Sequence, residues 1–154
     1  MKFTVRRDQL LRPLQLVCGV VERRQTAPIL SNLLIVAQSD RLVVTGSDEE
    51  VEITVIVEGV SLDSGGEMTV PARKLMDICK SLPGAAELTA SQDGVRVQID
   101  SGRFSSHLTS LPPVEFPSIE TSVSKVSVSL ASAQLHKLLQ RTSFAMAQQD
   151  VRYF

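Results

Sequence analysis

The fold of this chain is decided by one stretch, Met68-Thr69-Val70-Pro71-Ala72-Arg73-Lys74-Leu75. Its first three residues suit a short strand, and apolar residues then recur over 72–82 at the spacing of an amphipathic helix. Pro71 fits the first turn of that helix, where a missing N–H leaves no hydrogen bond unmade. The stretch therefore predicts a strand that runs directly into a helix.

The same pattern occurs three times. Phe3-Thr4-Val5 followed by Leu10 lies 65 residues earlier, and Val128-Ser129-Leu130 followed by Leu135 lies 60 residues later. Two expected hairpins, at 37–44 and 90–97, align at an offset of 53 residues. The sequence predicts a strand–helix–strands unit that is used twice and begun a third time. One unit cannot bury both its helix and its sheet, whereas two units can share a core.

The expected elements follow from periodicity. Helices are expected at 8–18, at 72–82 and from about residue 132, with Asp8 capping the first helix and Pro13 kinking it. Period-two alternation predicts strands most clearly at 51–57 and 95–99. Further strand candidates are 33–37, 42–45, 68–70, 88–90, 104–109 and 126–130. Ser39-Asp40 and Asp93-Gly94 are expected to be hairpin turns.

These elements predict a domain boundary near residue 120. Residues 1–120 form one α+β domain in this interpretation, with half-domain repeats at about 1–60 and 61–120. The Pro-rich stretch 111–117 and the Ser-rich stretch up to 124 are interpreted as a linker. Residues 121–154 are too few for a second domain, so we expect them to be the start of one, in a truncated chain.

Charge is sorted along the chain although its total is nearly even. The chain has 16 Lys+Arg and 17 Asp+Glu, a formal net charge of −1. The balance is +4 over 1–24, −7 over 40–70, +2 over 71–82 and +2 over 132–154. The total argues against nucleic-acid binding by overall basic charge, whereas the sorting is compatible either with a local basic surface or with an ordinary solvated one.

Several classes of protein are disfavoured. No apolar run approaches the roughly 20 residues of a membrane span, and the N-terminus has no secretory signal. Cys18 and Cys79 lack metal or redox spacing and favour a reduced, cytoplasmic protein. Phosphate-binding and nucleophile motifs are absent, and neither His107 nor His136 has a partner at metal-ligand spacing. We expect no catalytic residue, no metal and no cofactor.

Each expected helix carries a small basic excess opposite its apolar stripe. The cations are Arg12 on the first helix, Arg73 and Lys80 on the second, and Lys137 and Arg141 on the third. Such helices side by side would present a basic wall to phosphates without reading bases. The alternative is a solvated helix face held by local ion pairs such as Arg73–Asp77.

Six segments carry a resemblance to a known family. They are MKFTV at 1–5, TAPILSNLL at 26–34, LVVTGSDEE at 42–50, TVPARKL at 69–75, LTSLP at 108–112 and FAMAQQDVRYF at 144–154. Over all 154 residues the chain resembles the bacterial DNA polymerase III beta subunit, the replicative sliding clamp. The resemblance implies a DNA-clamp fold of class α+β, with duplicated strand–helix–strands units, antiparallel sheets outside and helices on one face.

The same resemblance implies a function without chemistry of its own. A complete clamp chain has three such domains, and two chains join head to tail as a homodimeric ring around duplex DNA. Its implied partners are duplex DNA without sequence preference, the replicative polymerase, the clamp loader and other clamp-binding proteins, with no membrane. A chain of 154 residues lacks the third domain and is not expected to close the ring.

Three sets of site residues are implied by the resemblance alone. DNA contacts are expected at Arg24, Arg73, Gln149, Tyr153 and Phe154. A dimer interface is expected at Lys74, Arg96, Arg103, Phe104 and Leu108, where Phe104 substitutes for an aromatic residue that the family usually has at Ser106. The rim of a pocket for partner peptides is expected at Arg152 and Phe154.

Without the resemblance, the residues are also compatible with two other functions. One is a β-rich repeat scaffold that binds only proteins. The other is a small-ligand enzyme whose site is dispersed over distant loops, which would require a deep pocket with a perturbed acid or histidine.

Overall fold

A computed structural model describes residues 1–21, 27–117, 119 and 126–146 of the chain. These divide into two compact units, the first over Met1–Glu120 and the second over Thr121–Phe154. This division follows from the contacts within the folded chain.

In the first unit, a strand, a helix and three strands follow one another twice. The first half contains β1 (Lys2–Arg6), α1 (Arg7–Val17), the 3-10 turn η1 (Pro28–Ser31), β2 (Asn32–Gln38), β3 (Arg41–Ser47) and β4 (Glu52–Glu58). The second half contains β6 (Gly66–Pro71), α2 (Ala72–Ser81), β7 (Glu87–Asp93), β8 (Arg96–Ser101), β9 (Phe104–Thr109) and the 3-10 turn η2 (Pro113–Glu115). The short strand β5 (Ser61–Ser64) joins the halves.

The two halves exchange their first strands. One antiparallel sheet has the order β5-β1-β7-β8-β9, and the other has the order β4-β3-β2-β6. The first half's β1 therefore pairs with β7 of the second half, and β6 of the second half pairs with β2 of the first. Neither half can build its sheet without the other half.

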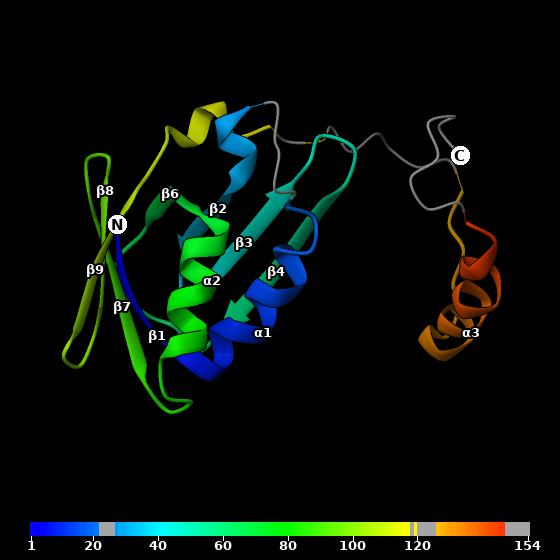
Figure 1. Ribbon diagram of the computed structural model, residues 1–154, viewed down its shortest axis with the longest axis horizontal. Coiled ribbons are helices and arrows are strands. Elements are labelled where there is room, and N and C mark those ends of the chain that lie inside the picture. The colour runs from blue at the N-terminus through cyan, green and yellow to red at the C-terminus, as the bar shows by residue number, and fades with distance from the viewer. Residues whose placement is uncertain (22–26, 118, 120–125, 147–154) are drawn as a thin grey trace. The chain divides into compact units, whose positions relative to one another are not determined.

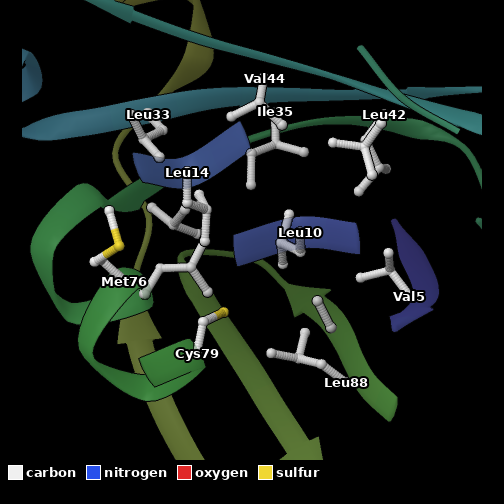
Figure 2. Packing of buried hydrophobic residues seen from close by; sticks show 14 of the residues in the cluster. Val5, Leu10, Leu14, Leu33, Ile35, Leu42, Val44, Met76, Cys79 and Leu88 are labelled. Atoms are coloured by element: carbon white, nitrogen blue, oxygen red, sulfur yellow. The ribbon is translucent and has the colours of Figure 1, made fainter. Parts of the chain in front are cut away.

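The sheets and helices enclose one main core. Figure 2 shows Leu10 and Leu14 of α1 between side chains of the four-stranded sheet on one side and Cys79 and Leu88 on the other. Alternation explains the sheet contribution, because every second residue of a strand faces the core. In β2, for example, Leu33, Ile35 and Ala37 are buried. The buried apolar side chains of both sheets and of both helices therefore form one common core.

Hairpin turns set the strand register. Ser39 and Asp40 form a two-residue loop between the paired residues Gln38 and Arg41, which confirms the predicted turn. The second predicted turn is shifted by one residue, because Asp93 pairs with Arg96 and the loop is Gly94 with Val95. Gly94 has φ +57°, a left-handed conformation that glycine adopts without a steric penalty.

Helices α1 and α2 lie where the periodicity predicted them, but the predicted cap of α1 is wrong. Asp8 does not cap α1, because Arg6 occupies the N-cap position and Asp8 lies within the first turn. Its carboxylate accepts a hydrogen bond from the Gln9 N–H at 3.0 Å. Pro13 lies inside α1, which continues to Val17.

The predicted linker begins later than its composition suggested. Residues 111–117 belong to the first unit, and Phe116 is buried in a small cluster with Ile29 and Leu30 of η1. Pro-rich composition indicates a chain that cannot join a sheet, but it does not exclude packing on one.

In the second unit, the predicted helix is present and the predicted strand is not. Helix α3 spans Ser132–Thr142 and is followed by the 3-10 turn η3 (Ser143–Ala145). Residues 126–130 form no strand, and no other strand is present among the described residues of this unit. Alternation of apolar and polar residues is compatible with a strand, but it does not by itself form one, because strand formation depends on the structural context.

Candidate nucleic-acid interface and strand-edge interface

Helices α1 and α2 lie side by side on the first unit (Figure 1) and contact each other. Their buried residues, such as Leu10 and Leu75, belong to the core. Their opposite sides expose the cations Arg12, Arg73 and Lys80, as the helical periodicity predicts. The pair thus presents basic residues from two helices that are far apart in sequence.

A shallow groove of about 330 Å³ lies between these helices. Its lining consists of Gln15, Cys18, Gly19, Arg73, Met76, Asp77 and Lys80. Two of these side chains are cationic and one is anionic, so the groove is net positive. No ion pair joins Arg73 to Asp77 in the described part of the chain, where the ion pairs are Lys2–Asp63 and Arg6–Asp8.

The thiol in this groove is protonated at neutral pH. Burial raises the pKa of Cys18 to about 11, against the opposing effect of the positive charges of Arg73 and Lys80. Both cations therefore lie close enough to the Cys18 sulfur to act on it electrostatically. The charge of the groove comes from its lysine, arginine and aspartate side chains, since a protonated thiol contributes none.

Arg73 also binds the backbone beside it. Its Nη2 donates a hydrogen bond to the carbonyl oxygen of Val21 at 3.2 Å. Val21 lies four residues after the end of α1. Arg73 can therefore hold the backbone that follows α1 while the rest of its guanidinium remains exposed to an anion.

Three cations near the N-terminus are already engaged. Lys2 Nζ lies 2.8 Å from a carboxylate oxygen of Asp63, and Arg6 Nη2 lies 2.6 Å from one of Asp8. The half-buried Arg7 donates from Nε to the carbonyl oxygen of Cys79 at 2.7 Å. The basic excess that the sequence shows over 1–24 is therefore only partly available to a polyanion.

Five of the implied site residues lie outside the described residues: Arg24, Gln149, Arg152, Tyr153 and Phe154. On the second unit's α3, the cations Lys137 and Arg141 are exposed.

The implied dimer-interface residues fall mostly on one hairpin. Strand β9 is an edge of the five-stranded sheet, and β8 and β9 carry Arg96, Phe104 and Leu108. Arg103 lies in the two-residue turn between the strands and not within one, because Ser101 pairs with Phe104. Lys74 lies elsewhere, as an exposed residue of α2.

The apolar members of this set face inward. Leu108 is only 4% exposed and belongs to the core, so it has no side-chain surface for a partner and supports the edge from within. Phe104 is half-buried and packs against the same core, on the same strand face as Ser106. What β9 offers outward is its free backbone edge and the side chains of Ser105, His107 and Thr109.

A polar cluster on the outer side of this hairpin was missed by sequence reasoning. Gln98 Nε2 donates to Asp100 Oδ1 at 3.0 Å and to Ser105 Oγ at 2.9 Å. Hydrogen bonds from Gln98 and Ser105 lower the pKa of Asp100. Alternation at 95–99 had placed Gln98 on the outer face, but the register that brings Ser105 opposite Asp100 has no local signal.

Two kinds of feature are absent from the described residues. Within the described ranges, no group of three or more His, Cys, Asp or Glu side chains is placed to hold a metal ion. No helix among the described residues is long and apolar enough to cross a membrane.

Comparison with known proteins gives matches across the whole chain. The model of the DNA polymerase III beta subunit N-terminal domain matches residues 1–120. The beta sliding clamp of Pseudomonas putida is 50% identical over 154 residues, which are all of this chain and 42% of that protein. The beta sliding clamp of Escherichia coli strain K12 is 44% identical over the same shares.

Solved structures agree with the sequence matches. The crystal structure of the DNA polymerase III subunit beta from Pseudomonas aeruginosa has a TM-score of 0.92 and 48% identity, over 99% of this chain and 42% of that one. Caulobacter crescentus pol III beta has a TM-score of 0.93 at 36% identity, over 99% and 41%. The chain thus spans about two fifths of the length of these relatives.

Proposed function

The chain belongs to the DNA polymerase III beta subunit family and has its clamp fold, and on this premise we propose that it is the N-terminal part of a sliding clamp. The complete protein encircles duplex DNA as a head-to-tail homodimer and tethers the replicative polymerase. It performs no chemistry itself and works in the cytoplasm. Its other partners are the clamp loader and further clamp-binding proteins.

The observation that carries this proposal is the pair of adjacent helices α1 and α2. Their apolar sides are buried in one core, and Arg73 and Lys80 lie along the groove between their outer sides. A surface of this kind attracts phosphates and contains no arrangement for reading bases. Binding by such a surface is independent of sequence, as sliding requires.

The domain organisation follows in the same way. We propose that residues 1–120 are one complete clamp domain with half-domain repeats at about 1–60 and 61–120, and that 121–154 begin the next domain. The division of the folded chain at Glu120 and the family match over 1–120 support this proposal. So does α3, whose apolar residues repeat those of α1.

The site residues divide into three proposed roles. Arg73 contacts DNA together with Arg24, Gln149, Tyr153 and Phe154, while Arg152 and Phe154 contribute to the rim of the partner-peptide pocket. Arg96 and Arg103 flank the free edge of β9, roughly 20 Å apart along the hairpin, and can pair with acids of an opposing strand. Phe104 and Leu108 support that edge, and Lys74 extends the interface from α2.

A topological experiment tests encirclement. We expect a full-length protein carrying this chain to stay on a closed circular duplex after loading, and to leave when the circle is cut, because a ring escapes only over an end. The double variant Arg24→Ala with Arg73→Ala should lose loading or retention. The matched control Lys2→Ala, whose amine pairs with Asp63, should not. Equal retention of the protein on closed and on cut DNA would contradict the proposal.

The chain of 154 residues should behave differently from the complete protein. We expect a polypeptide limited to these 154 residues to run in gel filtration as a species too small for a closed ring, because it covers only 42% of the length of a related clamp. A stable ring assembled from this chain alone would contradict the proposed head-to-tail arrangement.

A further inference from the structure

After β9 the chain crosses one end of the four-stranded sheet (Figure 1). We call residues 110–117 together with Ile119 the strap. It starts beside β6 and the first residue of β2, passes η1, and reaches the first residue of β4. Because β6 and β4 are the two edges of that sheet, the strap spans its full width.

The strap is held at its start by the hydroxyl of Thr69. Thr69 Oγ1 donates to the carbonyl oxygen of Leu111 at 2.8 Å and accepts from the Leu111 N–H at 2.9 Å. Asn32 Nδ2 donates to Thr69 Oγ1 at 3.0 Å. One donor and two acceptor positions are thus all used, which is the full hydrogen-bonding capacity of a hydroxyl.

Ser110 adds a second attachment. The Thr69 N–H donates to Ser110 Oγ at 3.2 Å, and this hydroxyl donates to the carbonyl oxygen of Leu111 at 3.2 Å. Thr69, Asn32 and Ser110 are all buried. A buried polar group that loses its partner is costly, so these bonds favour one position of the strap over all others.

Apolar packing holds the middle of the strap. Phe116 is buried against Ile29 and Leu30, and Leu111 packs against the same cluster. Prolines at 112, 113 and 117 fix φ and reduce the freedom that the segment would gain on release. At the far end the N–H of Ile119 donates to Glu52 Oε2 at 3.2 Å.

We propose that Thr69 is a positioning residue that fixes where the chain leaves the first unit. With the strap held, the exit point of the chain is set by the sheet. With it released, the residues of the strap would become a tether whose far end is no longer fixed to the sheet. Resting on the proposed function, the consequence is that neighbouring domains of the ring are joined by an anchored connection and not by a loose linker.

Hydrogen exchange of the chain itself tests the proposal. In Thr69→Val, which keeps the side-chain shape and removes the hydroxyl, we expect the Leu111 amide and those of 114–116 to exchange at least about 10-fold faster. Amides of β7 and β8 should be unchanged, and Thr69→Ser should restore protection because it restores the hydroxyl.

A matched control exists in the other half of the repeat. Thr4 is the counterpart of Thr69 at the 65-residue offset, and its hydroxyl bonds that of Thr89 at 2.9 Å without touching the strap. Thr4→Val should leave strap exchange as it is. Unchanged exchange at Leu111 in Thr69→Val would overturn the proposal, and so would an equal rise across all strands, since Thr69 would then be an ordinary core residue.

The exchange measurement uses no DNA. If the proposed clamp function failed, the DNA-retention experiment would fail while the exchange pattern of Thr69→Val stayed local. If the strap proposal failed, the reverse would hold.

Discussion

Helices α1 and α3 share four residues at the same spacing and differ completely in burial. Gln9, Leu10, Leu14 and Gln15 of α1 correspond to Gln134, Leu135, Leu139 and Gln140 of α3. Leu10 and Leu14 are 1% and 0% exposed, whereas Leu135 and Leu139 are 46% and 58% exposed. An apolar stripe therefore specifies which side of a helix can be buried, and the neighbouring elements decide whether it is.

The difference also concerns what holds each helix together. Isolated helices of about this length are marginal in water, so most of their stability comes from tertiary packing. Helix α1 receives that packing from both sheets and from α2, and α3 has no strand beside it in the described part of its own unit. This contrast predicts that equivalent substitutions in the two helices have unequal effects.

Truncation of equivalent leucines in α1 and α3 should give the largest difference in free energy of unfolding. We expect Leu14→Ala to lower the free energy of unfolding by about 2–5 kcal/mol, because it leaves a cavity in a packed core. Leu139→Ala should change it by less than about 0.5 kcal/mol. Urea unfolding monitored by circular dichroism measures both. Equal losses would mean that α3 is packed as tightly as α1.

The second test is the dependence of stability on pH as the buried thiols ionise. Burial raises the pKa of Cys79 to about 11, so the folded state holds the thiol proton more tightly than the unfolded state does. Stability is therefore complete below the ordinary thiol pKa and declines as pH rises toward 11, by up to about 2–3 kcal/mol. Unfolding measured from pH 8 to pH 11 should show this decline.

The control for that titration is the variant Cys79→Ala. It removes one of the two thiols whose pKa is raised and leaves Cys18, so its stability should fall less steeply over the same pH range without becoming independent of pH. Its starting stability is lower because the Cys79 side chain is buried. A slope identical to that of the unchanged chain would show that other groups cause the decline.

The close approach of α1 to β3 gives a third test. A Cβ at Gly46 would lie 2.7 Å from Val17 Cγ1 and 3.1 Å from the Val17 carbonyl oxygen. We expect Gly46→Ala to destabilise the first unit by about 1–3 kcal/mol, because α1 must move away from the sheet. Gly84→Ala, where a Cβ would meet nothing within 4 Å, should be close to neutral. Thermal melting compares the pair.

The weakest expected effect concerns the basic faces. In a full-length protein that carries this chain, Lys80→Ala should weaken DNA binding and reduce the slope of log affinity against log salt by about 1 if Lys80 meets a phosphate. Arg6→Ala, whose side chain is paired with Asp8, should leave the slope unchanged. A sequence preference in the binding would argue against a purely electrostatic lining.

The positions of the helices could be predicted from the sequence, but the contacts between distant segments could not. Periodicity located α1, α2 and α3 within a residue or so, because a helix is defined by contacts three and four residues apart. It gave no means of seeing that 126–130 would form no strand. Nor could it show that residues 111–117 are bound to Thr69, whose contact with Leu111 spans 42 residues.

The candidate site shows the same division. The helical wheel identified the exposed cations Arg73 and Lys80, because their exposure is a property of one helix. The groove between α1 and α2 depends on their packing, which no segment encodes alone. Alternation of Phe104, Ser106 and Leu108 was a signal that Leu108 faces inward, and it agrees with the burial observed.

The exchange of first strands has a consequence for biosynthesis. The contact between Thr4 and Thr89 spans 85 residues, so β1 cannot pair with β7 until most of the domain has been made. At 5–20 residues per second, the first strand waits roughly 4–17 seconds on the ribosome for that partner. During this interval Leu10 and Leu14 have no complete core to enter. We therefore expect the nascent chain to be a chaperone substrate until residues near 93 have emerged, and then to fold in one cooperative step.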